Sequence, residues 1–388
     1  MISYSNYLHD GRVHRYSQSL IQEGYRVDTI GLGFKGDTRK VEMDGVTVFR
    51  IQNRDFSESG PLSYFFNLII FFLKSLIFST KMHMKHRYDV IHFHNIPDFG
   101  VFCTLIVKWM GASIILDIHD LVPEFYRRKF NVSEKHIIIK MLRLLEQWSC
   151  RYADHVITVT DIWKDTLINR SLRNEKCSVI MNLPLSNVFK PIPYVSRKNN
   201  ESFNLSYHGN LAEQTGVDLL LDALALIVEQ APRIKLQIIG EGRMRTRLQE
   251  KSISLGLADC VQFLPLIPVK ELPRYMDAIH AAVDPKRDGV YAGETLSVKA
   301  MEYLSMRIPL IVSKTMAASL YFDTDTVCFV EPNNSEAIAR AILDLYQNEP
   351  LRKNLHLNAK KFNDQYNWTS MKTRYLQIIH KLVYGEVN

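Results

Sequence analysis

The chain has 388 residues, enough for two medium domains or three small ones, and each of two domains could bury a full hydrophobic core. Hydrophobic residues make up 46% and charged residues 23% of the sequence, a composition that excludes a disordered chain and a fibre. The net charge of +7 favours contact with anionic surfaces or phosphate-bearing ligands, and five widely spaced cysteines without a CxxC pair fit a reducing cytoplasm.

The N-terminal half alternates short apolar runs with longer helical patterns. Such alternation predicts βαβ units and a parallel sheet. The opening MISYSNYLHDGRVHR lacks the features of a secretory signal, so we expect a cytoplasmic location. The first helix is predicted at Arg12–Glu23, with Gly24 directly after its end. The strands predicted in this half are Val27–Ile30, Val46–Ile51, Val90–His94, Ser113–Asp117, His155–Val159 and Val179–Met181.

The most apolar window, Pro61–Thr80, approaches the length of a membrane-spanning helix. Asn67 and Lys74 near its middle argue against a span. A basic run follows at residues 81–87 and is typical of a segment that lies in a membrane interface beside anionic lipid. The alternative is a core helix with a solvated end, and the sequence leaves both interpretations open.

Two histidines and several polar residues follow neighbouring strands of this half. DVIHFHN places His92 and His94 on one face of a strand, and LDIHDLVPE places Asp117, His119 and Asp120 at the end of the next strand. Alternating histidines could bind a metal, but the spacing specifies no third ligand. We therefore expect no metal site and predict histidines that line a polar cleft.

Around Pro191 the alternation lapses into a polar stretch with two prolines, KPIPYVSRKNNESFN, which predicts a linker. The predicted parts are an N-terminal domain at residues 1–190, a linker at 191–203, a C-terminal domain at 204–368 and a C-terminal helix at 369–388 that packs across both domains. The strands predicted in the second domain are Phe203–His208, Leu236–Ile239, Val261–Leu264, Ala281–Asp284, Ile308–Val312 and Val327–Val330. Because ligands bind at the carboxyl ends of parallel strands, the cleft between the domains is the expected site.

Two glycine turns follow strands in the second domain. Gly209 and Asn210 lie between a strand and a helix that begins near Gly216, where backbone N–H groups could approach an anion. Gly240 and Gly242 form a GxG turn that could let a nucleotide base or ribose lie against the backbone, although a plain tight turn also explains it.

The most informative stretch is GETLSVKAMEYLSMRIPLIVS, residues 293–313. Glu294 and Glu302 are separated by seven residues, and Ser297 can cap a helix that contains Glu302. Lys299 falls in the first turn of that helix, where the macrodipole opposes a cation but free N–H groups beside a lysine suit a phosphate. The pattern predicts a phosphate site, and the alternative is a solvated lysine between unrelated glutamates.

Taken together, these segments resemble the family 4 glycosyltransferases of the GT-B fold over nearly the whole chain. The segments that carry the resemblance are LHDGRVHRYSQSLIQEGYRVDTI, YDVIHFHNIPD, LDIHDLVPE, YHGNLAEQTGVD, IIGEG and the E-x7-E block. The resemblance implies two Rossmann-like doubly wound α/β domains that face each other across a cleft. It also implies a retaining hexosyltransferase that uses a nucleotide diphosphate sugar as donor, without a cofactor or an obligatory metal.

The resemblance also implies roles for individual residues. Glu294 would contact the donor sugar, Glu302 would bind the ribose hydroxyls, and Lys299 with the Gly209–Asn210 backbone would hold the diphosphate. The implied catalytic residues are Glu294, His119 and Lys299; the implied donor-binding residues are Gly209, Asn210, Gly240, Gly242, Lys299 and Glu302; the implied acceptor-side residues are Asp10, Arg12, His94 and Asp120.

One departure from the family pattern concerns two cations. Many members carry an Arg after the loop glycine and a Lys before the helix glycine, where this chain has Asn210 and Thr215. The leading hypothesis is transfer to a lipid-linked or growing surface glycan, of the polysaccharide, capsule or lipopolysaccharide O-antigen type, by a peripheral protein on the anionic inner face of the plasma membrane. The alternatives are a non-catalytic GT-B partner of a glycan assembly complex and a nucleotide-sugar epimerase. The basic residues are scattered, so we expect no nucleic-acid partner.

Overall fold

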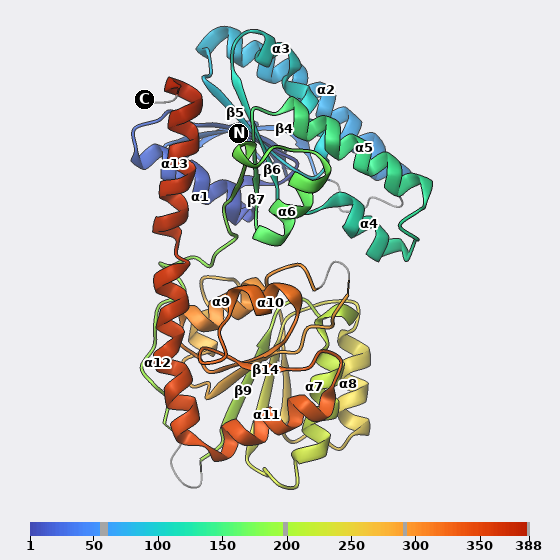
Figure 1. Cartoon of the computed structure of the whole chain (residues 1–388), viewed down its shortest axis with the longest axis vertical. Coiled ribbons are helices and arrows are strands. Elements are labelled where there is room, and N and C mark those ends of the chain that lie inside the picture. Colours follow the sequence, from blue (N-terminus) through green and yellow to red (C-terminus); the bar gives the residue numbers. More distant parts are fainter. Residues whose placement is uncertain (55–60, 197–200, 290–292, 386–388) are drawn as a thin grey trace. The chain divides into compact units, whose positions relative to one another are not determined.

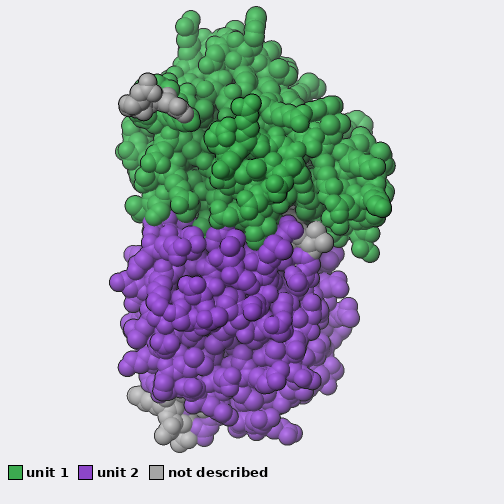
Figure 2. Space-filling view, viewed as in Figure 1, with its two compact units in different colours: residues 1–182, 369–388 green, residues 183–368 purple. Residues whose placement is uncertain are grey.

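The computed structural model describes residues 1–54, 61–196, 201–289 and 293–385, which form two compact units. Unit 1 contains Met1–Asn182 and Thr369–Asn388, and unit 2 contains Leu183–Trp368 (Figure 2). The chain therefore leaves unit 1 earlier than the predicted boundary at residue 190 and returns to it at the C-terminus.

The described part of the predicted linker lies within unit 2. The Ile192 N–H donates to the carbonyl of Met306 at 3.2 Å, and the Tyr194 ring packs edge-on against His356 with ring centroids 5.5 Å apart. Residues 197–200 of the linker lie outside the described residues. Residues 191–196 form no strand or helix, whereas Phe203, the last residue of the predicted linker, is the first residue of β9 in the sheet of unit 2.

Unit 1 is built on an eight-stranded sheet in the order β3-β4-β2-β1-β5-β6-β7-β8. Its neighbouring strands are parallel, except for the antiparallel pair β3 and β4. The strands are β1 Ile2–Ser3, β2 Asp28–Gly33, β3 Lys40–Met43, β4 Val46–Asn53, β5 Val90–His94, β6 Ser113–Ile118, β7 His155–Thr158 and β8 Cys177–Val179. The sequence patterns did not predict β1 or β3, although β1 is central to the sheet.

Helices cover both faces of this sheet (Figure 1), because side chains alternate between faces along each strand. On β5, His92 lies against Tyr16 of α1 and Tyr375 of α13, while Phe93 lies against Gly100 on the opposite face. The helices are α1 Gly11–Gln22, α2 Pro61–His86, α3 Leu105–Trp109, α4 Val122–Phe130, α5 Ile137–Tyr152, α6 Asp161–Arg170 and α13 Trp368–Tyr384.

The C-terminal helix α13 is an integral part of unit 1. Tyr375 is fully buried, and its hydroxyl lies 3.1 Å from His92 Nδ1. Lys372 forms an ion pair with Glu23 at 2.8 Å, and Ser113 Oγ donates to the carbonyl of Leu382 at 3.3 Å. The predicted helix at the C-terminus is confirmed, and these contacts attach it to the sheet of unit 1; its packing across both domains stays a prediction.

The apolar window of the sequence forms α2, whose inner face belongs to the core of unit 1. Leu68 and Phe71 are buried, and the Phe78 ring packs against Phe49 with centroids 5.0 Å apart. Its outer face exposes Phe65, Phe66, Ile70, Leu73 and Ile77. The segment Ser63–His86 is long and apolar enough to cross a membrane by length and composition, with 22% of its most apolar window buried.

Unit 2 is built on a six-stranded parallel sheet in the order β11-β10-β9-β12-β13-β14. The first three strands add to one side and the last three to the other, which is the doubly wound order. The strands are β9 Phe203–His208, β10 Ile234–Ile239, β11 Val261–Leu264, β12 Ala281–Asp284, β13 Leu310–Ser313 and β14 Cys328–Val330. The prediction of two doubly wound α/β domains is confirmed.

The core of unit 2 follows from the alternation along β9. Phe203, Leu205 and Tyr207 join the apolar cluster with residues of α7 and α11, while Ser206 and His208 contact Tyr303 of α9 on the other face. The helices are α7 Val217–Ile227, α8 Arg245–Ser254, α9 Val298–Ser305, α10 Met316–Tyr321, α11 Ser335–Gln347 and α12 Glu349–Gln365.

Candidate functional site

In each sheet the strand order reverses between two neighbouring strands, and crevices form beyond the carboxyl ends of such strands. The reversal lies between β1 and β5 in unit 1 and between β9 and β12 in unit 2. The residues that follow these four strands are therefore the first candidates for binding a ligand.

In unit 2 the two glycine turns pack directly against each other. A Cβ atom on Gly240 would lie 2.0 Å from the carbonyl oxygen of Gly209, and one on Gly242 would lie 2.4 Å from that of Leu211. Gly209 and Gly240 both have positive φ angles, which favour glycine. The Gly209 N–H donates to the carbonyl of Ile239 at 2.9 Å, so in this structure it is not available to a phosphate, in contrast to the prediction.

Lys299 lies beside these turns, in the first turn of α9. Ser297 caps this helix as predicted, accepting from the Ala300 N–H at 3.4 Å. The Lys299 ammonium lies 2.9 Å from Asp284 Oδ1 and 5.0 Å from the centroid of the Tyr207 ring, and its side chain is 15% exposed. The lysine is therefore held at the end of β12 and is not a solvated surface residue.

The electrostatics of this pair keep both groups charged. Burial alone would lower the pKa of Lys299, but the Asp284 carboxylate raises it above its usual value. Burial would likewise raise the pKa of Asp284, and the Lys299 charge lowers it below its usual value. A permanently charged ammonium at a helix N-terminus beside a glycine turn is chemically suited to a phosphate oxygen.

The two glutamates of the motif occupy different surroundings. Glu302 Oε2 lies 2.6 Å from Nε2 of His208, the last residue of β9, so its carboxylate has one fixed partner. Glu294 is half-buried and lies between two anchored residues. The Gly293 carbonyl accepts from the Ala317 N–H at 2.9 Å, and Lys286 Nζ donates to the Thr295 carbonyl at 2.7 Å.

The structure reveals partners that the sequence patterns missed. His208 and Asp284 end β9 and β12, and the rule that polar residues gather at the carboxyl ends of strands could have found both. Two arginines also reach this edge of the sheet: Arg245 donates to the Gly240 carbonyl at 2.5 Å, and Arg287 forms an ion pair with Asp218 at 2.5 Å.

The two positions that depart from the family pattern differ in exposure. Asn210 is exposed, whereas Thr215 is buried and donates its hydroxyl to the carbonyl of Ala212 at 2.6 Å. Thr215 thus stabilises the turn before α7, while Asn210 remains at the surface beside the glycine turns.

In unit 1 a pocket of about 190 Å³ lies beyond β1 and β5. Asp10 and His119 line it together with Asn95, whose Oδ1 accepts from the His119 N–H at 3.1 Å. Burial lowers the pKa of His119, so its imidazole is neutral near pH 7, and its Nδ1 has no hydrogen-bond partner among the described residues. Asp120 is half-buried, and its carbonyl accepts from Asn95 Nδ2 at 2.7 Å.

Asp10 has a structural role as well as a place in this pocket. Its carboxylate caps α1 by accepting from the Arg12 and Val13 N–H groups, and Ser5 Oγ donates to it at 2.6 Å. The sequence resemblance assigned Asp10 to the acceptor side, and its lining position is compatible with that assignment.

Arg12 and His94, also assigned to the acceptor side, are buried inside unit 1 and do not line the pocket. Arg12 donates to Asp117 Oδ2 at 2.7 Å and to Oδ1 at 2.9 Å, and His94 Nδ1 lies 3.0 Å from Oδ2. The His92 and His94 rings stack with centroids 4.1 Å apart. The prediction of histidines lining a polar cleft is therefore wrong, because α1 and α13 cover this face of the sheet.

His92, His94 and Asp117 also lie close enough together to hold a metal ion, with ligand atoms within 4.8 Å of one another. Arg12, however, binds both oxygens of the Asp117 carboxylate and places a positive charge beside them. The Arg12 guanidinium would repel a metal ion in this buried site. The residues therefore do not fit a metal and form a buried ion-pair network instead.

Comparisons with known proteins place both units in one group. Residues 189–362 match the family model for glycosyl transferases group 1, and residues 12–183 match that for glycosyltransferase family 4. A glycosyltransferase of Methanocaldococcus jannaschii is 24% identical, over 92% of this chain and 89% of its own. The phosphatidylinositol N-acetylglucosaminyltransferase gpi3 subunit of Schizosaccharomyces pombe is 20% identical, over 94% of this chain and 75% of its own. The crystal structure of Anabaena HepE with UDP superposes with a TM-score of 0.72 at 16% identity, covering 98% of both chains.

Proposed function

The chain belongs to the family 4 glycosyltransferases, and on that premise we propose that it moves a hexose from a nucleotide diphosphate sugar to a lipid-linked or growing surface glycan, with retention of the anomeric configuration. The observation that supports this proposal is the position of Lys299, a largely buried ammonium held between Asp284, the Tyr207 ring and the glycine turns. This arrangement lies where a doubly wound sheet binds its ligand.

In the proposed reaction Lys299 and the first turn of α9 bind the diphosphate of the donor. As the bond between the anomeric carbon and the phosphate oxygen breaks, negative charge grows on the departing diphosphate, and the ammonium stabilises it. The acceptor hydroxyl attacks from the same face and gives its proton to the departing phosphate oxygen. The proposed reaction requires neither a protein nucleophile nor a metal, because the departing phosphate accepts both the bonding electrons and the proton.

The motif glutamates would bind the rest of the donor. The Glu302 carboxylate, oriented by His208 at 2.6 Å, would accept hydrogen bonds from the ribose hydroxyls. Glu294, between the anchored Gly293 and Thr295, would contact hydroxyls of the transferred sugar. The structure of the relative with UDP supports a uridine nucleotide as the first donor to examine.

For the acceptor we propose a lipid-linked glycan at an anionic membrane, and α2 supports this part. Its outer face exposes large apolar side chains, including Ile77 at 70%, and α3, which packs beside it, exposes Trp109 at 89%. Lys74, Lys81 and Lys85 are exposed on the same helix. Apolar side chains beside lysines are typical of an interfacial surface. We propose that α2 lies on the membrane, because its inner face is part of the core of unit 1.

The function is tested by donor turnover in a Glu302→Gln variant. We expect KM for the donor to rise roughly 10-fold or more, since a hydrogen bond to a charged group contributes about 1.5–3 kcal/mol. The measurement is release of nucleoside diphosphate from a panel of nucleotide diphosphate sugars with a lipid-linked acceptor. Glu336→Gln, which changes an exposed glutamate of α11, is the matched control and should leave turnover unchanged.

Two results, one from product analysis and one from calorimetry, would contradict the proposal. Conversion of the donor sugar to its epimer without an acceptor would identify an epimerase. Lack of binding of every nucleotide diphosphate sugar in calorimetry would identify a non-catalytic partner.

The membrane surface is tested with a Phe66→Ser/Ile77→Ser variant. Burying such a side chain contributes roughly 1.5–3 kcal/mol, so we expect binding to anionic vesicles to weaken at least about 10-fold in a sedimentation assay. The matched control is Leu226→Ser/Ile253→Ser, which removes two exposed apolar side chains from unit 2. Equal weakening by both variants, or no binding by the unmodified protein, would exclude this surface.

A further inference from the structure

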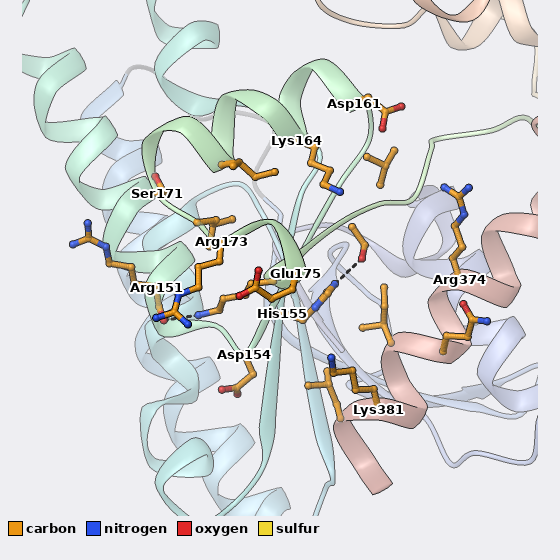
Figure 3. Close-up of a pocket in the computed structure, with 18 of the residues that line it drawn as sticks. Arg151, Asp154, His155, Asp161, Lys164, Ser171, Arg173, Glu175, Arg374 and Lys381 are labelled. Atoms are coloured by element: carbon orange, nitrogen blue, oxygen red, sulfur yellow. Dashed lines mark hydrogen bonds between the residues drawn. The ribbon is translucent and has the colours of Figure 1, made fainter. Parts of the chain in front are cut away.

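Unit 1 contains a second, larger pocket of about 1060 Å³ that shares no lining residue with the pocket beyond β1 and β5. It lies along the edge strand β8, between α6 and α13 (Figure 3). The proposed transfer reaction does not use any of its residues. Its walls come from segments far apart in the sequence, because α13 returns to unit 1 and closes one side of the pocket.

The pocket is strongly basic. Seven cationic and three carboxylate side chains line it, an excess of four positive charges. Figure 3 shows that the cations approach from several elements: Lys164 from α6, Arg173 from the segment before β8, and Arg374 and Lys381 from α13. The remaining cations are Arg151, Arg170 and Lys176.

One of the three carboxylates, Asp154, is bound to groups outside the pocket. Asp154 forms an ion pair at 2.7 Å with Lys108, which does not line the pocket, and Asp154 Oδ2 accepts from the Ile114 N–H. Within the part of the chain that the structure describes, Arg151, Lys164, Arg173 and Arg374 form no ion pair with a carboxylate. Four cations thus face the pocket without a carboxylate partner, and their mutual repulsion favours a bound anion.

The neighbouring cations also affect His155, which lies at the base of the pocket. Its Nε2 lies 2.9 Å from Ser178 Oγ, which fixes the ring at the start of β7. Burial, followed by repulsion from Lys381, Lys176 and Lys164, lowers the pKa of His155 to about 4. The imidazole is therefore neutral near pH 7 and adds no further positive charge.

The lining chemistry favours phosphate over other ligands. None of the described lining residues is Phe, Tyr or Trp, and the one aromatic ring among them, the His155 imidazole, is buried, so the pocket offers little surface on which a sugar or a nucleotide base could stack. It offers guanidinium and ammonium groups, which bind phosphate through several charge-assisted hydrogen bonds. Its volume and charge excess fit more than one phosphate group.

We propose that this basic pocket binds a ligand with two or more phosphate groups, separately from the sugar donor. The ligand is either a soluble polyphosphate-type anion or the phosphates of a lipid headgroup, because both present the same chemistry to these cations. The proposal does not depend on the transfer reaction, since the pocket and the Lys299 site have no residue in common.

The proposal is tested with a Lys164→Gln/Arg374→Gln variant of the full chain. Both side chains are at least partly exposed, so the fold should tolerate the change. Calorimetry with inorganic tripolyphosphate should give an affinity at least about 10-fold weaker than that of the unmodified protein, since two charge-assisted contacts are lost. Lys35→Gln/Lys353→Gln removes the same charge from exposed positions outside the pocket and should change the affinity less than about twofold.

Further binding experiments distinguish a lipid headgroup from a soluble ligand and define the results that would overturn the proposal. Binding to vesicles that contain cardiolipin, whose headgroup carries two phosphates, would identify a lipid headgroup if the Lys164→Gln/Arg374→Gln variant loses it. Binding confined to tripolyphosphate would identify a soluble ligand. The proposal is wrong if the unmodified protein binds neither, if both double variants weaken binding equally, or if a poly-glutamate peptide binds as tightly as tripolyphosphate. Affinity for the sugar donor should be the same in all three proteins.

Discussion

A Lys299→Met variant is expected to lose donor turnover by roughly 10-fold to 100-fold, because one charge-assisted contact to phosphate contributes about 1.5–3 kcal/mol. It should also be less stable by about 3–5 kcal/mol, since Asp284 would remain buried without its partner at 2.9 Å. The measurements are nucleoside diphosphate release and urea denaturation followed on the transition of unit 2.

A second variant separates the catalytic role of Lys299 from its structural one. Lys299→Met/Asp284→Asn removes both charges, so stability should largely return while turnover stays low. If turnover returned together with stability, Lys299 would serve only to neutralise Asp284. Lys251→Met is the matched control, because the Lys251–Asp222 pair at 2.6 Å is partly exposed and contributes little.

An Arg12→Met variant is expected to destabilise unit 1 by about 3–5 kcal/mol. Arg12 donates to both oxygens of Asp117 and to the Ile180 carbonyl at 3.0 Å, and the arginine and the carboxylate are both buried. Its loss would leave the Asp117 carboxylate beside two histidines, His94 at 3.0 Å and His92 at 3.8 Å, without a guanidinium partner. Calorimetry of the unit 1 transition measures the effect, and Arg26→Met, at an exposed position, should change stability by less than about 0.5 kcal/mol.

The pH dependence of this variant has a defined sign. Burial alone would raise the pKa of Asp117, but the Arg12 charge and the bonds from His94 and Arg12 hold it well below its usual value. In the unmodified protein the ionised Asp117 carboxylate therefore stabilises the fold. This stabilisation is fully present above the pKa of an unfolded Asp, about 4, and is lost as the pH falls through the pKa of Asp117 in the folded protein. Without Arg12, burial raises the pKa of Asp117. The loss of stability in the Arg12→Met variant should therefore be smaller at pH 4 than at pH 7. A deficit that does not change with pH would contradict this account.

The local sequence predicted most strands because each is a short apolar run with clear ends. The bounds of β5, β9, β11 and β12 agree with the predicted runs. The sequence did not predict β1, since its two residues, Ile2 and Ser3, carry no pattern of their own. They become a strand only because β2 and β5 flank them.

The same division holds for the candidate site. The sequence by itself determined the fold class, the family, the helix cap at Ser297 and the place of Lys299 in the first turn of α9, since these depend on neighbours within one turn or one strand. The tertiary structure alone decided that Asp284 pairs with Lys299, that Asp117 forms an ion pair with Arg12 in the interior of unit 1, and that α13 lines one side of the basic pocket. Each of these contacts joins separate segments of the chain, and their free energy depends on burial and charge separation, which local periodicity does not encode.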